Sequence, residues 1–189
     1  MMIYPARMDW PRLVPFAILA ASIGALIITY MAELAFGIEP CILCLYQRIP
    51  YALAGALAVA ALLAPETWGP RPKVWAVIGA AVAFLAGAEI AFYHVGVEQH
   101  WWRSVASCGV AASDPEPETV EELRRLLTEA RPTKTCDEVE WALFGVSMAT
   151  YNVATSLALA VGSFLGAEKI GGRHEQEGSK NEKADNEKA

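Results

Sequence analysis

The run LVPFAILAASIGALIITYM at residues 13–31 contains no charged side chain, and it decides the fold class. At 1.5 Å per residue, a helix of this length crosses a hydrocarbon layer of about 30 Å. A cleaved signal peptide is the alternative, but the run is longer than the apolar core of such a peptide, and no small-residue cleavage motif precedes a polar segment. The sequence therefore predicts a first membrane span that extends to about residue 35.

Three further apolar runs follow along the chain. The run at residues 49–64 reaches spanning length when residues 45–48 form its first turn, and short links on either side of it predict tight hairpins. The predicted spans are therefore residues 13–35, 45–64, 74–95 and 141–165. We expect an all-α membrane protein, a four-transmembrane-helix bundle over residues 1–166.

The segments outside the spans have a different character. The long acidic loop 96–140 contains apolar residues at helical spacing, namely Val120, Leu123, Leu127 and Ala130. This spacing predicts a short amphipathic helix, which either lies on the membrane surface or forms a solvent-exposed loop helix. Residues 167–189 are rich in Glu, Lys, Asn and Gly, so we expect a disordered cytoplasmic tail.

The overall composition agrees with a membrane protein. Hydrophobic residues make up 54% of the chain, charged residues 19%, and the mean hydropathy is +0.30. A chain this apolar is not disordered, and a small soluble domain normally carries about a quarter charged residues. The apolar excess must face membrane lipid or a partner. The net charge of −6 argues against nucleic-acid binding.

The positive charges next to the spans predict the orientation in the membrane. Lysines and arginines lie before the first span, between the second and third, and after the fourth: Arg7, Arg12, Arg71, Lys73, Lys169 and Arg173. The positive-inside rule makes this side cytoplasmic. The loop 96–140 also holds basic residues, but its length lowers their weight. We expect a multi-pass protein with both termini in the cytoplasm.

The four cysteines all fall in the first and third links. With four spans, these links lie on the same face of the membrane, which the charge pattern makes the exocytoplasmic one. In bacteria this face borders the oxidising compartment. Two pairs on one side suggest a shared redox chemistry.

The first pair, Cys41 and Cys44, begins the second predicted helix directly after Pro40. A helix N-terminus stabilises thiolate over thiol, so the position predicts a lowered thiol pKa. Arg48 lies four residues after Cys44, on the same helix face, where a guanidinium can stabilise a thiolate and an anionic oxygen of a bound acceptor. A Cys-x-x-Cys with this arginine at the outer end of a membrane helix favours a redox site.

The second pair, Cys108 and Cys136, has three possible interpretations. A structural disulfide would constrain the unfolded chain by roughly 3.6 kcal/mol. A second redox pair would exchange thiols with an outside protein and then with the first pair. Metal binding by the four cysteines would need a closed tetrahedral site, yet the second pair lacks the short spacing of zinc ribbons. We therefore expect no metal.

Three separated motifs resemble the disulfide bond formation protein B (DsbB) family of inner-membrane oxidases. They are PCILCLYQR at residues 40–48, YHVGVEQ at residues 93–99, and Cys136 followed by Trp141, Phe144-Gly145 and Ser147-Met148. Gln47 departs from the pattern, because some members carry Glu there. The loop and tail outside these motifs show no clear resemblance.

The resemblance implies an activity and a partner. Members pass electrons from a periplasmic thioredoxin-fold dithiol oxidase (DsbA-like) to the quinone pool, which supports disulfide formation during protein folding. The chain would then be a bacterial inner-membrane enzyme, a protein-disulfide oxidoreductase with ubiquinone or menaquinone as acceptor.

The resemblance also implies roles for single residues. The partner's thiol would attack Cys108, Cys136 would attack Cys41, and the displaced Cys44 thiolate would act as charge-transfer donor to the quinone. Arg48 would polarise the quinone oxygen, which agrees with the expected build-up of negative charge on that oxygen. His94 would donate a hydrogen bond or proton to the quinone.

Other interpretations stay open from the sequence. His94 is equally an ordinary interfacial histidine, and Glu89 is either functional or hydrogen-bonded to a neighbouring helix. A non-catalytic membrane protein with two structural disulfides is the main alternative function. A haem protein is a second alternative, although the chain lacks Cys-x-x-Cys-His and an obvious pair of intramembrane ligands.

Overall fold

The fold consists of long helices. The computed structural model describes residues 9–37, 40–102, 119–120, 136, 139 and 142–188. Its elements in chain order are α1 (Trp10–Phe36), α2 (Ile42–Leu63), the 3-10 helix η1 (Glu66–Trp68), α3 (Arg71–Glu98), β1 (Ala142–Leu143), β2 (Val146–Ser147) and α5 (Met148–Lys188). Four of the helices contain stretches that are long and apolar enough to cross a membrane: Trp10–Ala35, Ile42–Leu63, Arg71–Glu98 and Met148–Gly172. The predicted four-helix membrane fold is confirmed.

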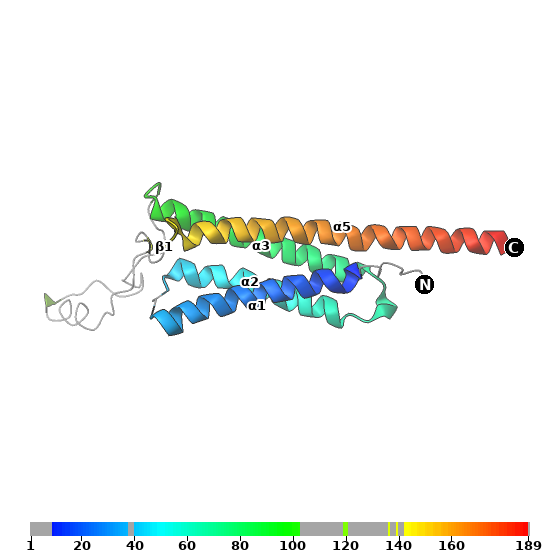
Figure 1. The fold of residues 1–189 in the computed structure, drawn as a ribbon, viewed down its shortest axis with the longest axis horizontal. Coiled ribbons are helices and arrows are strands. Elements are labelled where there is room, and N and C mark those ends of the chain that lie inside the picture. Colours follow the sequence, from blue (N-terminus) through cyan, green and yellow to red (C-terminus); the bar gives the residue numbers. More distant parts are fainter. Residues whose placement is uncertain are drawn as a thin grey trace, which may run out of the picture.

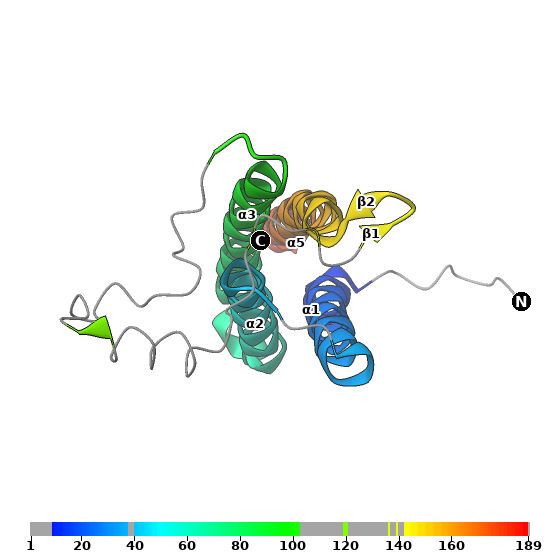
Figure 2. The same cartoon turned by 90° about the vertical axis from the view of Figure 1, so that its left-hand side faces the viewer.

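The four long helices form a bundle in which each helix packs mainly against two neighbours. Seen end-on, α2 lies between α1 and α3, and α5 lies between α3 and α1 (Figure 2). Along the bundle, α1 begins and α5 ends toward the same end, while the connection from α1 to α2 lies at the other end (Figure 1). The start of α2 and the end of α3 therefore lie at this second end.

Many small side chains pack in the interior of the bundle beside a few large ones such as Phe84, and many large apolar side chains point outward. Ala54 on α2 and Ala80 on α3 are fully buried, whereas Leu63 and Trp75 expose 76% and 70% of their surface. Lipid solvates large apolar side chains as well as a protein core does, so membrane helices associate through small residues that let their backbones approach. The exposed apolar surface is therefore the expected outer face of a membrane bundle.

One glycine shows how closely two helices approach. A Cβ atom added at Gly166 on α5 would lie 2.6 Å from Cγ1 of Val14 on α1. Any larger residue would push these two helices apart at this point.

The last span begins later than the sequence predicts. Residues 142–147 form a small antiparallel hairpin, in which Ala142 pairs with Ser147 and Leu143 with Val146. Phe144 and Gly145 at its tip have positive φ angles of 53° and 80°, which a helix does not allow. An uncharged stretch satisfies a span criterion whether or not it is helical, so the sequence extended the helix through this turn. In the structure α5 starts at Met148.

The tail also differs from its prediction. Instead of a disordered segment from residue 167, the structure continues α5 as one helix to Lys188. Ala167 and Ile170 belong to the buried core, and the stretch that follows contains no proline and many good helix formers. The predicted amphipathic helix lies largely outside the described residues.

Candidate functional site

The two thiols of the first pair lie at the start of α2. Cys41 is the N-cap residue in an extended conformation, and its Sγ accepts a hydrogen bond from the backbone N–H of Cys44 at 3.4 Å. Both residues are reduced, and Cys41 Sγ donates to Cys44 Sγ across 3.1 Å. A disulfide requires about 2.05 Å, so the pair can close with a movement of about 1 Å.

The predicted lowering of the thiol pKa is wrong for Cys41. The hydrogen bond that it donates to Cys44 and its burial raise the pKa of Cys41 to about 12, while contacts with His94 and with the Cys44 backbone lower it. Cys41 keeps its proton because that proton already has an acceptor, and because burial disfavours the charged thiolate. The position at a helix N-terminus contributes less than these two effects.

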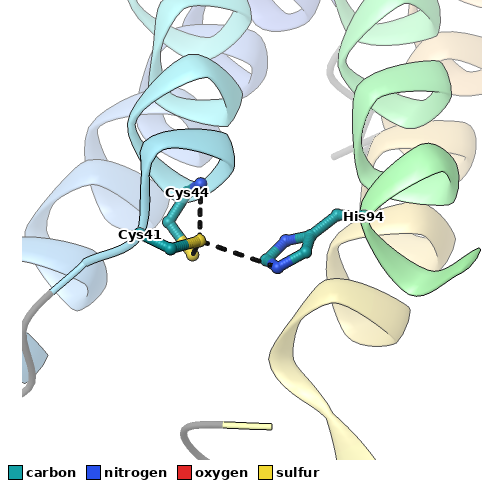
Figure 3. Close-up of side chains that lie close together, drawn as sticks. All are labelled: Cys41, Cys44 and His94. Atoms are coloured by element: carbon teal, nitrogen blue, oxygen red, sulfur yellow. Dashed lines mark hydrogen bonds between the residues drawn. The ribbon is translucent and has the colours of Figure 1, made fainter. Parts of the chain in front are cut away.

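His94 faces the two thiols from α3 (Figure 3). Its Nε2 lies 3.6 Å from Cys41 Sγ and 3.9 Å from Oε1 of Glu98, one turn further along α3. On the opposite edge of the ring, Nδ1 lies 2.9 Å from Nε2 of Gln47. His94 is 4% exposed, so its position is set by protein contacts, unlike that of a hydrated interfacial histidine.

Cys136 joins the first pair in the structure. It is buried, and it forms one apolar cluster with Cys41, Leu43 and Val97. Cys136 lies nearly a hundred residues after Cys41 in the sequence, yet it packs in the same cluster, as thiol–disulfide exchange between the two residues requires. Cys108 lies outside the described residues.

Arg48 is held against α1. Its Nη2 donates to Oε2 of Glu33 at 2.9 Å, and its guanidinium lies over the ring of Tyr30, 4.6 Å from the centroid. The side chain is only 13% exposed, and among the described residues its Nε has no hydrogen-bond partner. A buried donor without a partner is costly, so this nitrogen is suited to an added acceptor.

A cavity of about 310 Å³ connects these groups. Four of the five predicted site residues that the structure describes line it, namely Cys41, Cys44, Arg48 and His94, and Glu33 from α1 completes one wall. Residues from α5 form another wall, among them Met148, Tyr151, Asn152 and Thr155. These four predicted residues therefore line one partly open cavity in the bundle.

Several polar residues of this site were not predicted. Asn152 accepts a hydrogen bond from Tyr51 and donates one to Gln47, and Glu98 lies beside His94. Glu33 had a sequence signal, since it is a carboxyl group at the end of an otherwise uncharged span. The amides and the tyrosine had none, because polar uncharged residues within a span are common.

Glu89 lies away from this cavity. It is exposed on the outer side of α3 and lines an apolar groove between α2 and α3. Above it, Trp102 stacks on Tyr93 with 5.9 Å between ring centroids and donates from Nε1 to the Tyr93 carbonyl. Tryptophan and tyrosine side chains are typical anchors at a membrane interface.

The thiols and the histidine are also spaced as metal ligands. One ligand atom each from Cys41, Cys44 and His94 lies within 4.8 Å of the others. Such a Cys₂His set occurs in zinc enzymes, so geometry alone does not separate a redox pair from a metal site.

The fold and the site together define an integral membrane protein with a dithiol centre at one end of a four-helix bundle. Residues 11–166 match the family described as Disulfide bond formation protein DsbB. The chain is 31% identical over 153 residues to disulfide bond formation protein B of Xanthomonas axonopodis pv. citri, covering 79% of this chain and 86% of that protein. A protein of the same name from Xylella fastidiosa is 30% identical over 138 residues, with 73% and 79% covered.

A third relative adds coverage. An uncharacterized protein of Rickettsia prowazekii is 25% identical over 160 residues, which span 85% of this chain and 88% of that protein. The chain belongs to the disulfide bond formation protein B (DsbB) family. Its class of activity is the formation of disulfide bonds, and its four membrane-spanning helices make it a multi-pass membrane protein.

Proposed function

We propose that the protein is a thiol:quinone oxidoreductase of the bacterial inner membrane, which reoxidises a periplasmic thioredoxin-fold dithiol oxidase and passes the electrons to quinone. The observation that carries this proposal is that Cys44, Arg48 and His94 line one cavity beside the buried Cys136. The family supports the disulfide chemistry. The cavity supports an electron acceptor inside the bundle.

The thiol steps take the order that the family resemblance implies, with Cys108 outside the described residues. A thiolate of the partner attacks the Cys108–Cys136 disulfide and forms a mixed disulfide with Cys108, which releases Cys136 as a thiolate. Cys136 then attacks Cys41 Sγ: the Cys41–Cys44 bond breaks, a Cys136–Cys41 bond forms, and Cys44 leaves with the electron pair. Thiolate attack on a disulfide sulfur is the ordinary exchange reaction, and the contact of Cys136 with the cluster around Cys41 fits the second step.

The residues around the cavity fit a quinone. Arg48 Nε is a buried donor without a partner among the described residues, as a quinone carbonyl oxygen requires, and the surrounding walls are largely apolar. Arg48 and His94 would hold the head group near Cys44. A bound quinone would supply a two-electron, two-proton acceptor. The fixed charge of Arg48 would stabilise negative charge as it develops on the acceptor side of the cavity.

The orientation follows the charge pattern and the fold. The start of α1 lies beside the part of α5 that holds Lys169, whose Nζ lies 5.4 Å from the centroid of the Trp10 ring. Arg12 and Lys169 are the basic flanks of these two spans, and the positive-inside rule assigns this side to the cytoplasm. The dithiol centre would then face the periplasm, where the partner is found.

The test is quinone absorbance with purified protein and a reduced thioredoxin-fold dithiol oxidase. Wild type should consume quinone catalytically, and Cys44→Ser should not. Ser22→Ala, which changes a buried hydroxyl in the middle of α1, is the matched control and should behave as wild type. Absence of turnover in the wild type, with an active quinone reductase run alongside, would contradict the proposal.

Two alternatives predict other results. Structural disulfides would resist mild reductant and would not be re-formed by quinone. A metal centre at Cys41, Cys44 and His94 would copurify with about one zinc per chain, and the zinc would leave when Cys44 is replaced.

A further inference from the structure

A chain of buried hydrogen bonds runs from α5 to the dithiol centre. Tyr51 Oη donates to Asn152 Oδ1 at 2.6 Å, and Ser156 Oγ donates to the same oxygen at 3.1 Å. Asn152 Nδ2 donates to Gln47 Oε1 at 2.5 Å. Gln47 Nε2 then lies 2.9 Å from His94 Nδ1. The chain thus links α2, α5 and α3 through the interior of the bundle.

The direction of this chain determines the tautomer of His94. An amide nitrogen only donates, so the Gln47 amide nitrogen makes His94 Nδ1 an acceptor. The neutral ring must then carry its proton on Nε2. That nitrogen lies 3.6 Å from Cys41 Sγ, which in turn donates to Cys44 Sγ. Every donor points the same way, and the last acceptor is the Cys44 sulfur.

From this arrangement we infer that Gln47 and Asn152 are positioning residues, which hold His94 as an Nε2–H donor so that the hydrogen-bond chain stabilises negative charge on Cys44. Gln47 is 8% exposed and Ser156 fully buried, so the chain operates in a low-dielectric interior. Consecutive hydrogen bonds with one direction polarise one another. The reaction assigned to Cys44 rests on the proposed function, whereas the tautomer and the thiolate are properties of the reduced protein alone.

Two observations support this direction. The contact with His94 lowers the pKa of Cys41, as a donor would, whereas the hydrogen bond to Cys44 raises it because Cys41 keeps its own proton for donation. Glu98 Oε1, 3.9 Å from His94 Nε2, is a second acceptor on the same side of the ring. Cys41 Sγ and Glu98 Oε1 therefore both lie on the side of the ring where this arrangement puts the Nε2 proton.

The first experiment reads the tautomer by ¹⁵N NMR of histidine-labelled, reduced protein in detergent, without partner or quinone. His94 is identified among the three histidines by its loss in His94→Gln. Wild type should show protonated Nε2 and unprotonated Nδ1. Gln47→Glu, which offers only an acceptor when ionised, should move the proton to Nδ1. A wild-type protein with the proton on Nδ1 overturns the inference.

The second experiment measures the alkylation rate of Cys44 at a fixed pH near 8, resolved by mass spectrometry. Asn152→Leu breaks the chain and should slow the reaction about fivefold, the effect of one ordinary hydrogen bond. Ser163→Ala removes another buried hydroxyl of α5 that has no partner among the described residues, and it should leave the rate unchanged.

Two results overturn the inference here: an unchanged rate in Asn152→Leu, or an equal loss in both variants. Tyr51→Phe, which keeps the ring and removes the first donor, replaces Asn152→Leu if that variant does not fold. It is judged by the same outcomes. If quinone turnover fails while the His94 tautomer is the expected one, the result counts against the proposed function and does not contradict the inference about the hydrogen-bond chain.

Discussion

Replacement of Arg48 by lysine should separate the two tasks of this side chain. In the structure, Nη2 binds Glu33 at 2.9 Å, while the buried Nε has no partner among the described residues. A lysine can keep the ion pair, since its ammonium reaches a carboxylate. It cannot also present a second donor in a fixed direction, because it lacks the planar fork of a guanidinium. Arg48→Lys therefore tests the unpaired nitrogen with the ion pair retained.

The expected loss follows from the number of donors. Removal of one preorganised donor to a developing negative charge costs about 10²–10³ in kcat. We expect Arg48→Lys to lose about a hundredfold in kcat with quinone. Arg48→Met also leaves Glu33 as an unpaired carboxylate in a partly buried site, so it should lose more activity and some thermal stability as well.

The assay follows quinone absorbance at saturating reduced partner and varied quinone, which gives kcat and KM separately. Arg12→Lys is the matched control, because Arg12 is 71% exposed at the opposite end of the bundle. Oxidation of Cys41 and Cys44 by a chemical oxidant should proceed in all variants. A kcat for Arg48→Lys within threefold of wild type would refute the role given to Nε.

Three further outcomes are expected. Cys108→Ser should abolish oxidation of the partner protein, while small dithiols should still reduce the Cys41–Cys44 pair. Partner oxidation that survives this change would contradict the proposed order of thiol exchange. The pKa of Cys41 is raised from 9.0 to about 12, so alkylation of Cys41 in the reduced protein should stay slow near neutral pH and rise only as the pH approaches 12. A pH series of alkylation rates, resolved by mass spectrometry, checks this. A rise centred near pH 9 would show that burial and the hydrogen bond to Cys44 have little effect on the pKa. Gly96→Ala should displace the indole of Trp102 from Tyr93, since the added Cβ would lie 2.0 Å from its ring; tryptophan fluorescence should then shift to the red, and an unchanged spectrum would contradict the close packing.

Local rules account for what the sequence predicted correctly. A membrane span depends on length and apolarity along one helix, so four spans were visible without any knowledge of their packing. The same locality explains the errors. The apolar turn at Phe144 and Gly145 satisfied the hydropathy rule although it is not helical. The polar segment beyond residue 167 did not satisfy that rule although it is helical.

The candidate site divides in the same way. The sequence by itself determined the helices, the segregation of the cysteines to one side, and the placement of Arg48 one turn below Cys44, because each depends on spacing within a short segment. Only the tertiary structure decided that Glu33 holds Arg48, that Cys136 packs with Cys41, and that Asn152 reaches His94 through Gln47. These contacts join different helices, and their existence depends on how each helix is rotated about its axis. That rotation is set by the packing of all four helices together, so no single stretch of sequence contains it.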